Sequence, residues 1–596
     1  MTIMAQFPRH LPKDEETGRP RAAAQPVTFS GTVGLFMPAH PALAATRLAA
    51  LFVSPWGFEE LCLRKTWRIL AEKLSDAGIA SLRFDHANTG DALDHETPTL
   101  ALWRDTVIDA AAELKRLSGA DGVILIGQGL GAALAAEVAG HIDGVCGYAA
   151  LAPVVSGRAH LRELALWSKM TEDRTDLEPG GDPVSGGSML ARSLSEDIRA
   201  INLSRTMALP ARDCLVAARA DRPGDADLAN RLTELGGDAV TVTYEGYDRL
   251  VGNLIFSRPP LTLIETIVTW VKGIEAGRPH LQPFPVSPPA AATPLAGPGF
   301  IETPLRFGDN DRLYGILCEP ADSDVKGAMV LMPTTAYERL SGWGRIATGT
   351  ARDLASAGIP SFRFDAASAG DSPPVPGAPE QIVYSEAQGQ DAEAAIDFLA
   401  RRRPGPIVIA GRCSGGYLAF HTAARDKRIR AILATNPYVF YWDGSQSLEE
   451  LMHFMPQQLS QYGVKAFRFG TWKRILNGEI NVKYAVINIS RAIQRRMLAA
   501  AAPILKAIPA LAREHRAVHG AFRALEERGV PFSLIYSEGD IGLDYFKLHF
   551  GPNGEKLKRY ANVRHQIVAG ADHNLSTDAA RDLFLREITA MALEHK

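Results

Sequence analysis

The stretch Val408–Tyr417 carries the clearest chemical signal in the chain, and it reads Val-Ile-Ala-Gly-Arg-Cys-Ser-Gly-Gly-Tyr. An apolar run typical of a buried strand ends at Gly411, and an alanine-rich helical pattern runs from Tyr417 to Arg425. Small residues on both sides of Cys413 permit a sharp, strained turn that holds the thiol above the sheet. A helix N-terminus supplies positive potential, which favours the thiolate, so the pattern predicts a nucleophilic cysteine.

This Gly-x-Cys-x-Gly segment resembles the nucleophile elbow of the α/β-hydrolases, with cysteine in the place of the usual serine. The alternative is a glycine-rich strand-to-helix turn, such as a phosphate cradle, that contains a buried cysteine. Polyhydroxyalkanoate synthases share the Gly-x-Cys-x-Gly-Gly string, but little else in the chain is similar to them.

A thiol nucleophile needs a base, and in the α/β-hydrolases an acid and then a histidine follow the nucleophile on loops after later strands. An apolar strand pattern from Phe532 ends in Glu538-Gly-Asp540, and the resemblance favours Asp540 as the acid, with Glu538 as the alternative. A Gly-Ala-Asp-His run after the next strand makes His573 the candidate base. Two further histidines are expected to be structural: His421 and His565.

Acyl transfer also needs two N–H groups that stabilise an oxyanion. The resemblance implies that one belongs to Ser414, the residue after the nucleophile, and that the other comes from the loop within 331–339, where Thr335 is the candidate. This loop lacks the His-Gly sequence of many lipases. In the expected mechanism His573 takes the thiol proton, Asp540 orients the imidazole, and an acyl-cysteine forms before transfer to water or another acceptor.

Strand and helix patterns alternate along the chain, which predicts mostly parallel sheets with helices on both faces. In the first half we expect strands at 48–53, 79–84, 123–126, 145–151, 215–218 and 240–244, and helices around 64–77, 101–117, 131–140 and 225–235.

An internal repeat divides the chain into two halves. Residues 71–91 align with residues 351–371 at an offset of 280, and twelve of the twenty-one positions are identical. Both segments contain Arg-Phe-Asp-x-x-x-x-Gly-Asp, in which Asp85 and Asp365 are expected to be turn and capping residues rather than catalysts. The prediction is two tandem α/β-hydrolase domains at 27–275 and 300–596, with a flexible tail at 1–26 and a Pro/Ala-rich linker at 276–299.

The first half lacks the catalytic residue types. Gly129 stands in the place of the cysteine, Arg249 stands in the place of the histidine, and Asp221 is the acid that remains. Glycine supplies no nucleophile, and arginine stays protonated at neutral pH. We therefore expect a catalytically silent first domain that stabilises the protein, binds a ligand or partner, or presents the acyl acceptor.

A long segment at about 438–530 is expected to form the cap that selects the substrate. Its aromatic residues and its basic, apolar stretch suit a lipid-like chain or a membrane surface, but packing within the cap is the favoured interpretation. The sequence of 462–480, with the cysteine elbow and Asn436-Pro-Tyr, resembles the exosortase-associated α/β-hydrolases, which are linked to bacterial exopolysaccharide production. No particular substrate follows from this resemblance.

Composition bears on the kinds of partner and on the compartment of the protein. The chain has 596 residues, 46% of them hydrophobic and 22% charged, and a formal charge of −3, which gives no reason to expect nucleic acid. Five scattered cysteines indicate neither a disulfide framework nor a metal site, and the N-terminus lacks a signal-peptide pattern, so a cytoplasmic protein is expected.

The sequence thus predicts a hydrolase or acyltransferase that needs no cofactor and acts on a small-molecule ester or thioester. The alternative is a non-catalytic scaffold or ligand-binding protein. The sequence indicates no oligomeric state.

Overall fold

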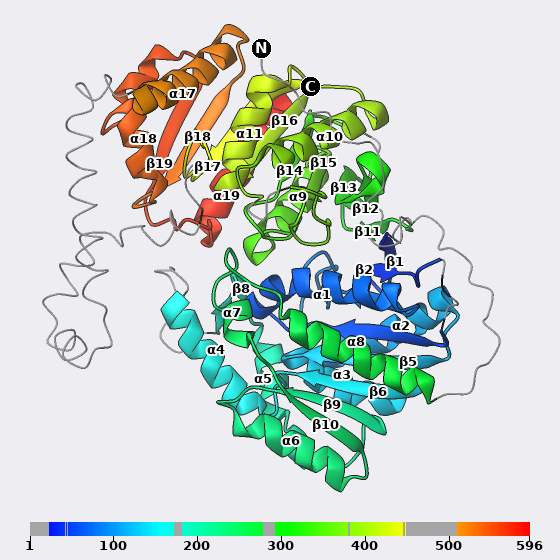
Figure 1. The fold of residues 1–596 in the computed structure, drawn as a ribbon. Helices are drawn as coiled ribbons and strands as arrows, with labels where there is room; N and C mark the ends of the chain where they lie inside the picture. The colour runs from blue at the N-terminus through cyan, green and yellow to red at the C-terminus, as the bar shows by residue number, and fades with distance from the viewer. Residues whose placement is uncertain are drawn as a thin grey trace, which may run out of the picture.

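The computed structural model describes residues 23–171, 182–277, 292–378, 382–444 and 509–596, apart from positions 42, 44, 45 and 323, and also Leu448. The chain forms two large β-sheets, each covered by helices on both faces (Figure 1). We refer to residues 23–277 as the N-terminal unit and to residues 292–596 as the C-terminal unit.

The strands of the first sheet are β1 (Gln25–Phe29), β2 (Thr32–Met37), β3 (Leu48–Val53), β4 (Ala80–Phe84), β5 (Gly122–Gln128), β6 (Val145–Leu151), β9 (Asp213–Ala218) and β10 (Asp238–Thr243). They lie in the order β1-β2-β4-β3-β5-β6-β9-β10. The β1–β2 and β2–β4 pairs are antiparallel, and the other pairs are parallel. Strands β3 and β6 have the bounds predicted from the sequence, because a strand buried on both faces is a continuous apolar run.

The helices of the N-terminal unit are α1 (Phe58–Asp76), α2 (Leu100–Ser118), α3 (Leu130–Val138), α4 (Gly157–Thr171), α5 (Arg192–Ala200), α6 (Pro223–Glu234), α7 (Tyr247–Val251) and α8 (Leu261–Ala276). Helices α1 and α8 pack on one face of the sheet, and α2, α3 and α6 pack on the other. A short hairpin of β7 (Val184–Ser185) and β8 (Ser188–Met189) follows α4.

The strands of the second sheet are β11 (Leu295–Gly297), β12 (Phe300–Phe307), β13 (Leu313–Pro320), β14 (Met329–Pro333), β15 (Ser361–Asp365), β16 (Ile407–Arg412), β17 (Ile429–Thr435), β18 (Phe532–Ser537) and β19 (Val563–Val568). Their order is β11-β12-β13-β15-β14-β16-β17-β18-β19, so from β12 onward it repeats the order of the first sheet. This is the strand order of the α/β-hydrolase fold, and the predicted fold class is confirmed. Strand β11 lies inside the range 276–299 that the sequence assigns to the linker, and it pairs with β12.

The helices of the C-terminal unit are α9 (Ile346–Ser356), α10 (Glu386–Arg402), α11 (Ser414–Arg425), α17 (Pro509–Glu527), α18 (Gly542–Phe550) and α19 (Asp578–Glu594). Helices α9 and α19 cover one face of the sheet, and α10, α11 and α17 cover the other. Most of the predicted cap, including residues 462–480, lies outside the described residues. Of the helices in the described ranges, none has the length and apolar character to cross a bilayer.

The two units share a buried apolar layer. The core beneath α1 and α8 of the N-terminal unit continues into the C-terminal unit through Tyr314 and Ile316 on β13 and through Leu340. Strands β1 and β12, which occupy the same place in their sheets, also lie beside each other (Figure 1). These contacts place the loops at the ends of the two sheets against one another.

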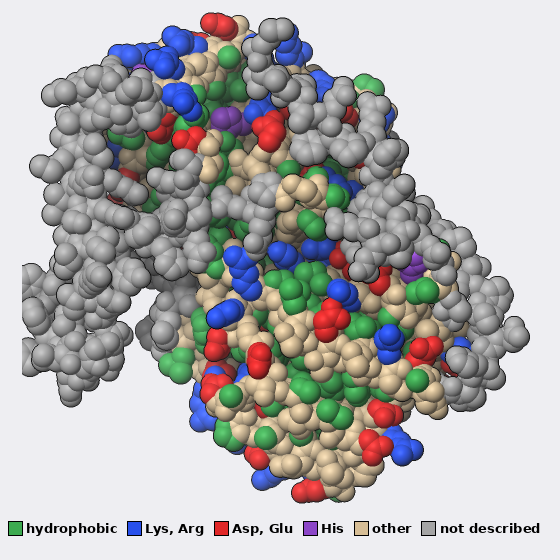
Figure 2. Space-filling model, viewed as in Figure 1, with side chains coloured by type: hydrophobic (Ala, Val, Ile, Leu, Met, Phe, Trp, Pro, Cys, Tyr) green, Lys and Arg blue, Asp and Glu red, His purple; other side chains and the backbone are tan. Residues whose placement is uncertain are grey.

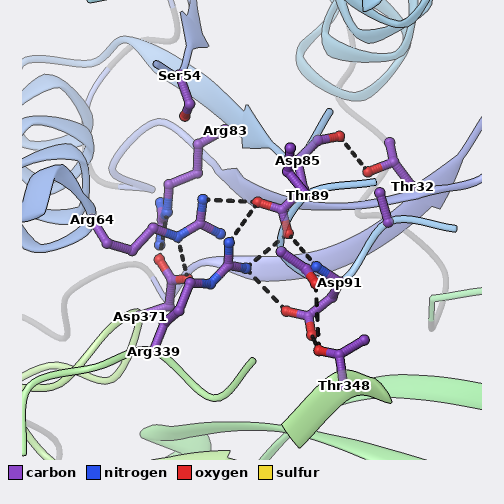
Figure 3. Close-up of polar contacts among 12 residues, drawn as sticks. Thr32, Ser54, Arg64, Arg83, Asp85, Thr89, Asp91, Arg339, Thr348 and Asp371 are labelled. Atoms are coloured by element: carbon purple, nitrogen blue, oxygen red, sulfur yellow. Dashed lines mark hydrogen bonds and ion pairs between the residues drawn. The ribbon is translucent and has the colours of Figure 1, made fainter. Parts of the chain in front are cut away.

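A buried ionic cluster lies where the units meet (Figure 3). Arg339 of the C-terminal unit donates to both carboxylate oxygens of Asp85 at 2.8 Å and to Asp91 at 3.0 Å. Arg64 of the N-terminal unit donates to Asp371 at 3.0 Å. None of these five side chains is more than 4% exposed. Removal of one member would leave a buried charge without its partner, so the cluster holds the two units in one arrangement.

Two contacts of this cluster are related by the sequence repeat. Arg83 donates to Asp371 at 2.7 Å, and Arg363 donates to Asp91 at 3.0 Å. Residues 363 and 371 follow residues 83 and 91 by the repeat offset of 280. The same pair is therefore formed in both directions, as at the interface of a two-fold dimer.

The first aspartate of each repeated motif closes its own turn. The Asp85 carboxylate accepts a hydrogen bond from the Asp91 N–H at 2.9 Å, and the Asp365 carboxylate accepts one from the Asp371 N–H at 2.8 Å. The turn role expected from the sequence is present in both units. The structure adds that Asp85 also binds Arg339 across the junction.

Candidate active site

Cys413 lies at the turn between β16 and α11. Its φ of 51° and ψ of −120° are strained for a residue with a side chain. Its N–H donates to the Thr435 carbonyl at 2.8 Å, which ties the turn to β17. A Cβ at Gly411 would lie 2.2 Å from the backbone of Gly415, so glycine is needed for the strand to end this close to the helix. The strand, turn and helix predicted from the sequence therefore position the sulfur.

The five cysteines are all free, and Cys413 alone among them is partly exposed. Burial raises the pKa of the Cys62 and Cys318 thiols, and it raises the pKa of Cys214 to about 12. Since the thiolate is the reactive form, these buried thiols are poor nucleophiles at neutral pH.

His573 lies between Asp540 and Cys413. Its Nδ1 is 2.6 Å from Asp540 Oδ2, and the Cys413 side chain lies near enough to the ring to affect its pKa. The other carboxylate oxygen of Asp540 accepts from the Gly542 N–H at 2.8 Å, which fixes the acid. Burial works to lower the pKa of His573, but Asp540 and Cys413 raise it to about 10. The ring therefore favours its protonated form at neutral pH.

The alternative acid and the two structural histidines have other surroundings. Glu538 is exposed at the end of β18, and its N–H donates to the Val568 carbonyl at 2.8 Å. His421 Nε2 is 2.9 Å from the Phe440 carbonyl, and burial lowers its pKa to about 4. His565 is exposed on β19. The structure brings Asp540, and not Glu538, to the His573 ring.

The loop after β14 lies against the elbow. Thr335 Oγ1 donates to the Arg412 carbonyl at 2.9 Å, and the Ala336 N–H donates to the Ser414 hydroxyl at 2.6 Å. Ser414 is the first residue of α11, so its own N–H has no acceptor within the helix. This arrangement suits the predicted oxyanion role of the Ser414 N–H. Because the Ala336 N–H is already used, Thr335 stays the candidate for the second donor.

Two buried side chains with no role predicted from the sequence hold the loops of the candidate site. Asn436 Nδ2 donates at 2.9 Å to the His573 carbonyl and to Ser537 Oγ, so it joins the histidine loop to β18. Arg412 donates to Asn574 Oδ1 at 2.7 Å and pairs with Glu338. Their positions in the sequence could have indicated these roles, because Arg412 directly precedes the cysteine and Asn436 directly follows the next strand.

The corresponding turn of the N-terminal unit keeps the elbow backbone without the nucleophile. Gly129 has a φ of 56° and a ψ of −121°, within a few degrees of Cys413. A Cβ at Gly129 would lie 2.4 Å from Glu59 Oε2. Gln128 and Tyr247 donate to the Glu59 carboxylate at 3.0 and 3.2 Å. Burial raises the pKa of Glu59, although these hydrogen bonds and Arg219 oppose the rise. Glu59 therefore fills the space that a nucleophile would need.

Asp221 and Arg249, the other two predicted remnants of the N-terminal site, lie on the surface. The Asp221 side chain is 77% exposed and pairs with Arg222, and Arg249 is exposed on α7. Their positions in the sequence match those of Asp540 and His573, but the structure does not bring them to the elbow. Within the described ranges, no group of three or more His, Cys, Asp and Glu side chains is placed to hold a metal ion.

No protein-family model and no curated protein matches the chain. Solved structures that resemble it include an α/β serine hydrolase homologue from Coxiella burnetii, with 12% identity, a TM-score of 0.27, and coverage of 46% of this chain and 91% of that chain. An esterase from Pyrococcus furiosus has 12% identity, a TM-score of 0.30 and coverage of 49% and 90%. A membrane phospholipase A has 18% identity, a TM-score of 0.28 and coverage of 49% and 87%. Since these values are low, the fold assignment depends on the strand order.

Proposed function

We propose that the chain is a tandem α/β-hydrolase whose C-terminal domain transfers an acyl group from an ester or thioester through an acyl-Cys413 intermediate. The supporting observation is that the His573 ring lies between Asp540 and a thiol held at a strained elbow. The candidate base thus contacts the orienting acid and lies near the thiol, which is the arrangement that covalent acyl transfer needs.

The reaction begins with the thiol proton on the His573 ring and the charge on the Cys413 sulfur. The sulfur attacks the acyl carbonyl carbon, and the carbonyl oxygen takes up the negative charge beside the N–H groups of Ser414 and Thr335. The bond to the leaving alcohol or thiol then breaks, and the imidazolium gives its proton to the leaving group. Water or another acceptor next donates a proton to the ring and attacks the acyl-cysteine, which releases the sulfur.

This proposal can be tested by treating the folded protein with short acyl thioesters and measuring its intact mass. We expect the wild type to gain one acyl mass at Cys413, Cys413→Ala to gain none, and His573→Ala to react about 10²–10⁴-fold more slowly. Cys318→Ala is the matched control, because it removes a buried thiol and should leave the adduct unchanged.

A second candidate is a non-catalytic scaffold, which the filled elbow of the N-terminal unit favours. A folded wild-type protein that gains no acyl mass from any thioester or ester would support the scaffold and reject the enzyme.

A further inference from the structure

A cavity of about 210 Å³ lies between the two units. Helix α1, the loop after α7 and loops of the C-terminal unit form its walls. The lining residues used below are Arg64, Lys65, Ile255, Arg258 and Tyr337. The cavity exists only because the units are docked, since neither unit supplies all of its walls.

Lys65 is a cation of this wall that has no counterion among the described residues. In the described part of the chain, its ammonium has no hydrogen bond and no ion pair with a carboxylate. Burial lowers the pKa of Lys65, and the nearby Arg68 and Arg258 lower it further. Arg64, the neighbouring residue on α1, is instead neutralised by Asp371 and other carboxylates of the ionic cluster.

Arg68 pairs with Glu72 at 2.6 Å, but a partly buried ammonium with no carboxylate partner among the described residues is unfavourable until an anion joins it. Lys and Arg side chains gather along the junction of the two units on the face shown in Figure 2. The cavity also presents apolar side chains, among them Leu61, Leu254 and Ile255. An anionic group on a partly apolar molecule has the matching chemistry.

The cavity shares one loop with the candidate active site. Tyr337, in its wall, is two residues after Thr335 in the loop that lies against the elbow. Tyr337 and Ile255 both pack against an apolar cluster that contains Tyr384. Burial raises the pKa of Tyr384, and the nearby Cys413 adds to the rise. The apolar cluster therefore lies against the cavity wall and also has a member, Tyr384, close enough to Cys413 for the thiol to affect its pKa.

We infer that this cavity is an anion subsite, which binds a carboxylate or phosphate carried by the ester or thioester that reacts at Cys413. The inference depends on the proposed function and deepens it, because it assigns the substrate a negative charge. It also gives the N-terminal unit a task without catalysis: its α1 helix and the 254–258 loop form the wall that recognises the charge.

Three thioesters with the same acyl chain length separate the possible sources of the charge. An acyl N-acetylcysteamine is neutral, its ω-carboxyacyl analogue carries a carboxylate on the acyl side, and an acyl coenzyme A carries phosphates on the thiol side. We expect one charged thioester to acylate wild-type Cys413 about tenfold faster than the neutral one, which is the effect of one charge-assisted contact. The faster one identifies the source.

Lys65→Gln should reduce the ratio of charged to neutral rates to about one. Lys73→Gln is the matched control, because Lys73 lies on the same helix, is exposed and pairs with Glu265 at 2.7 Å, so the ratio should stay at the wild-type value. Equal rates for all three thioesters in the wild type, or an unchanged ratio in Lys65→Gln, would overturn the anion subsite while leaving the acyl-cysteine proposal intact.

A binding measurement tests the anion subsite independently of the proposed acyl-cysteine reaction. Inorganic pyrophosphate should raise the Tm of the wild type and of Lys73→Gln more than that of Lys65→Gln. This result without any acyl adduct would support the anion site and reject the proposed reaction. Equal shifts in all three proteins would count against the anion site.

Discussion

Asp540 has two contacts that together define its role. One oxygen accepts from the Gly542 N–H and the other meets the His573 ring, so the carboxylate is fixed and raises the pKa of the ring. Neither the sequence of β18 nor its length distinguishes Asp540 from Glu538, because both acids follow the same strand. The turn after the strand makes the distinction, since it buries one side chain and exposes the other.

Asp540→Asn keeps the size of the side chain and removes its charge. We expect acylation of Cys413 to slow by about 10²–10⁴-fold, because the ring loses the group that orients it and stabilises its charge. In the wild type the ring loses its proton as the pH rises through about 10, and in the variant it should do so at lower pH. Single-turnover acylation rates across pH, with an ester whose leaving group needs a proton, measure both effects.

Glu538→Gln is the control for this variant, since Glu538 is exposed and should leave the rate and its pH dependence unchanged. A larger loss in Glu538→Gln than in Asp540→Asn would show that the acid is assigned to the wrong residue.

At the level of elements, the two elbows show how the same backbone supports different outcomes. The β5–α3 and β16–α11 turns have nearly the same dihedral angles, but the first is filled by Glu59 from the first turn of α1. The sequence pattern placed this helix from residue 64, whereas it begins at Phe58. The predicted bounds therefore put Glu59 in a loop, and no sequence motif marks it as part of the site.

Gly129→Cys should not restore a reactive thiol in the N-terminal unit. The new residue would have a positive φ, and its Cβ would lie 2.4 Å from Glu59 Oε2. We therefore expect a loss of about 1–3 kcal/mol in unfolding free energy and no acyl adduct at residue 129. Urea denaturation and peptide mass analysis measure the two effects.

Gly140→Cys serves as the comparison, because a Cβ at Gly140 meets nothing within 4 Å and the position is exposed. An adduct at residue 129 would mean that the filled elbow does not prevent acylation. Equal stabilities of the two variants would mean that Glu59 does not crowd the position.

At the scale of the whole molecule, the two equivalent aspartates of the repeat have opposite pKa shifts. Burial would raise the pKa of Asp85, but Arg339 and Arg64 lower it to about 2. Asp365, its counterpart in the repeat, forms no ion pair with an arginine among the described residues. Although Arg339 works to lower its pKa, burial and the neighbouring Asp371 carboxylate raise it to about 8. The sequence predicted the repeat but not this asymmetry, because Arg339 is distant in sequence from the aspartates that it binds.

Asp365→Asn should therefore stabilise the protein at mildly alkaline pH. A folded-state pKa above the unfolded value gives stability that is fully present below the unfolded pKa and is lost as the pH rises through about 8. Asparagine mimics the protonated acid and avoids this loss, so we expect a gain of about 1–3 kcal/mol over the wild type near pH 8 and a smaller difference near pH 5. Denaturant unfolding at several pH values measures the difference.

Asp85→Asn is the matched control and should have the opposite sign. It removes a charge that Arg339 and Arg64 need, so we expect a loss of about 3–5 kcal/mol at neutral pH. Losses of similar size in both variants would show that Asp365 is ionised in the folded protein.

The pair of contacts from Arg83 to Asp371 and from Arg363 to Asp91 has a consequence for the history of the chain. A face that binds a copy of itself is what a one-domain ancestor would use to form a homodimer. Gene duplication and fusion would place both copies in one polypeptide, where their association no longer depends on protein concentration. In such a fused chain one copy can lack a nucleophile and still be retained, because the contacts between the two copies do not require one.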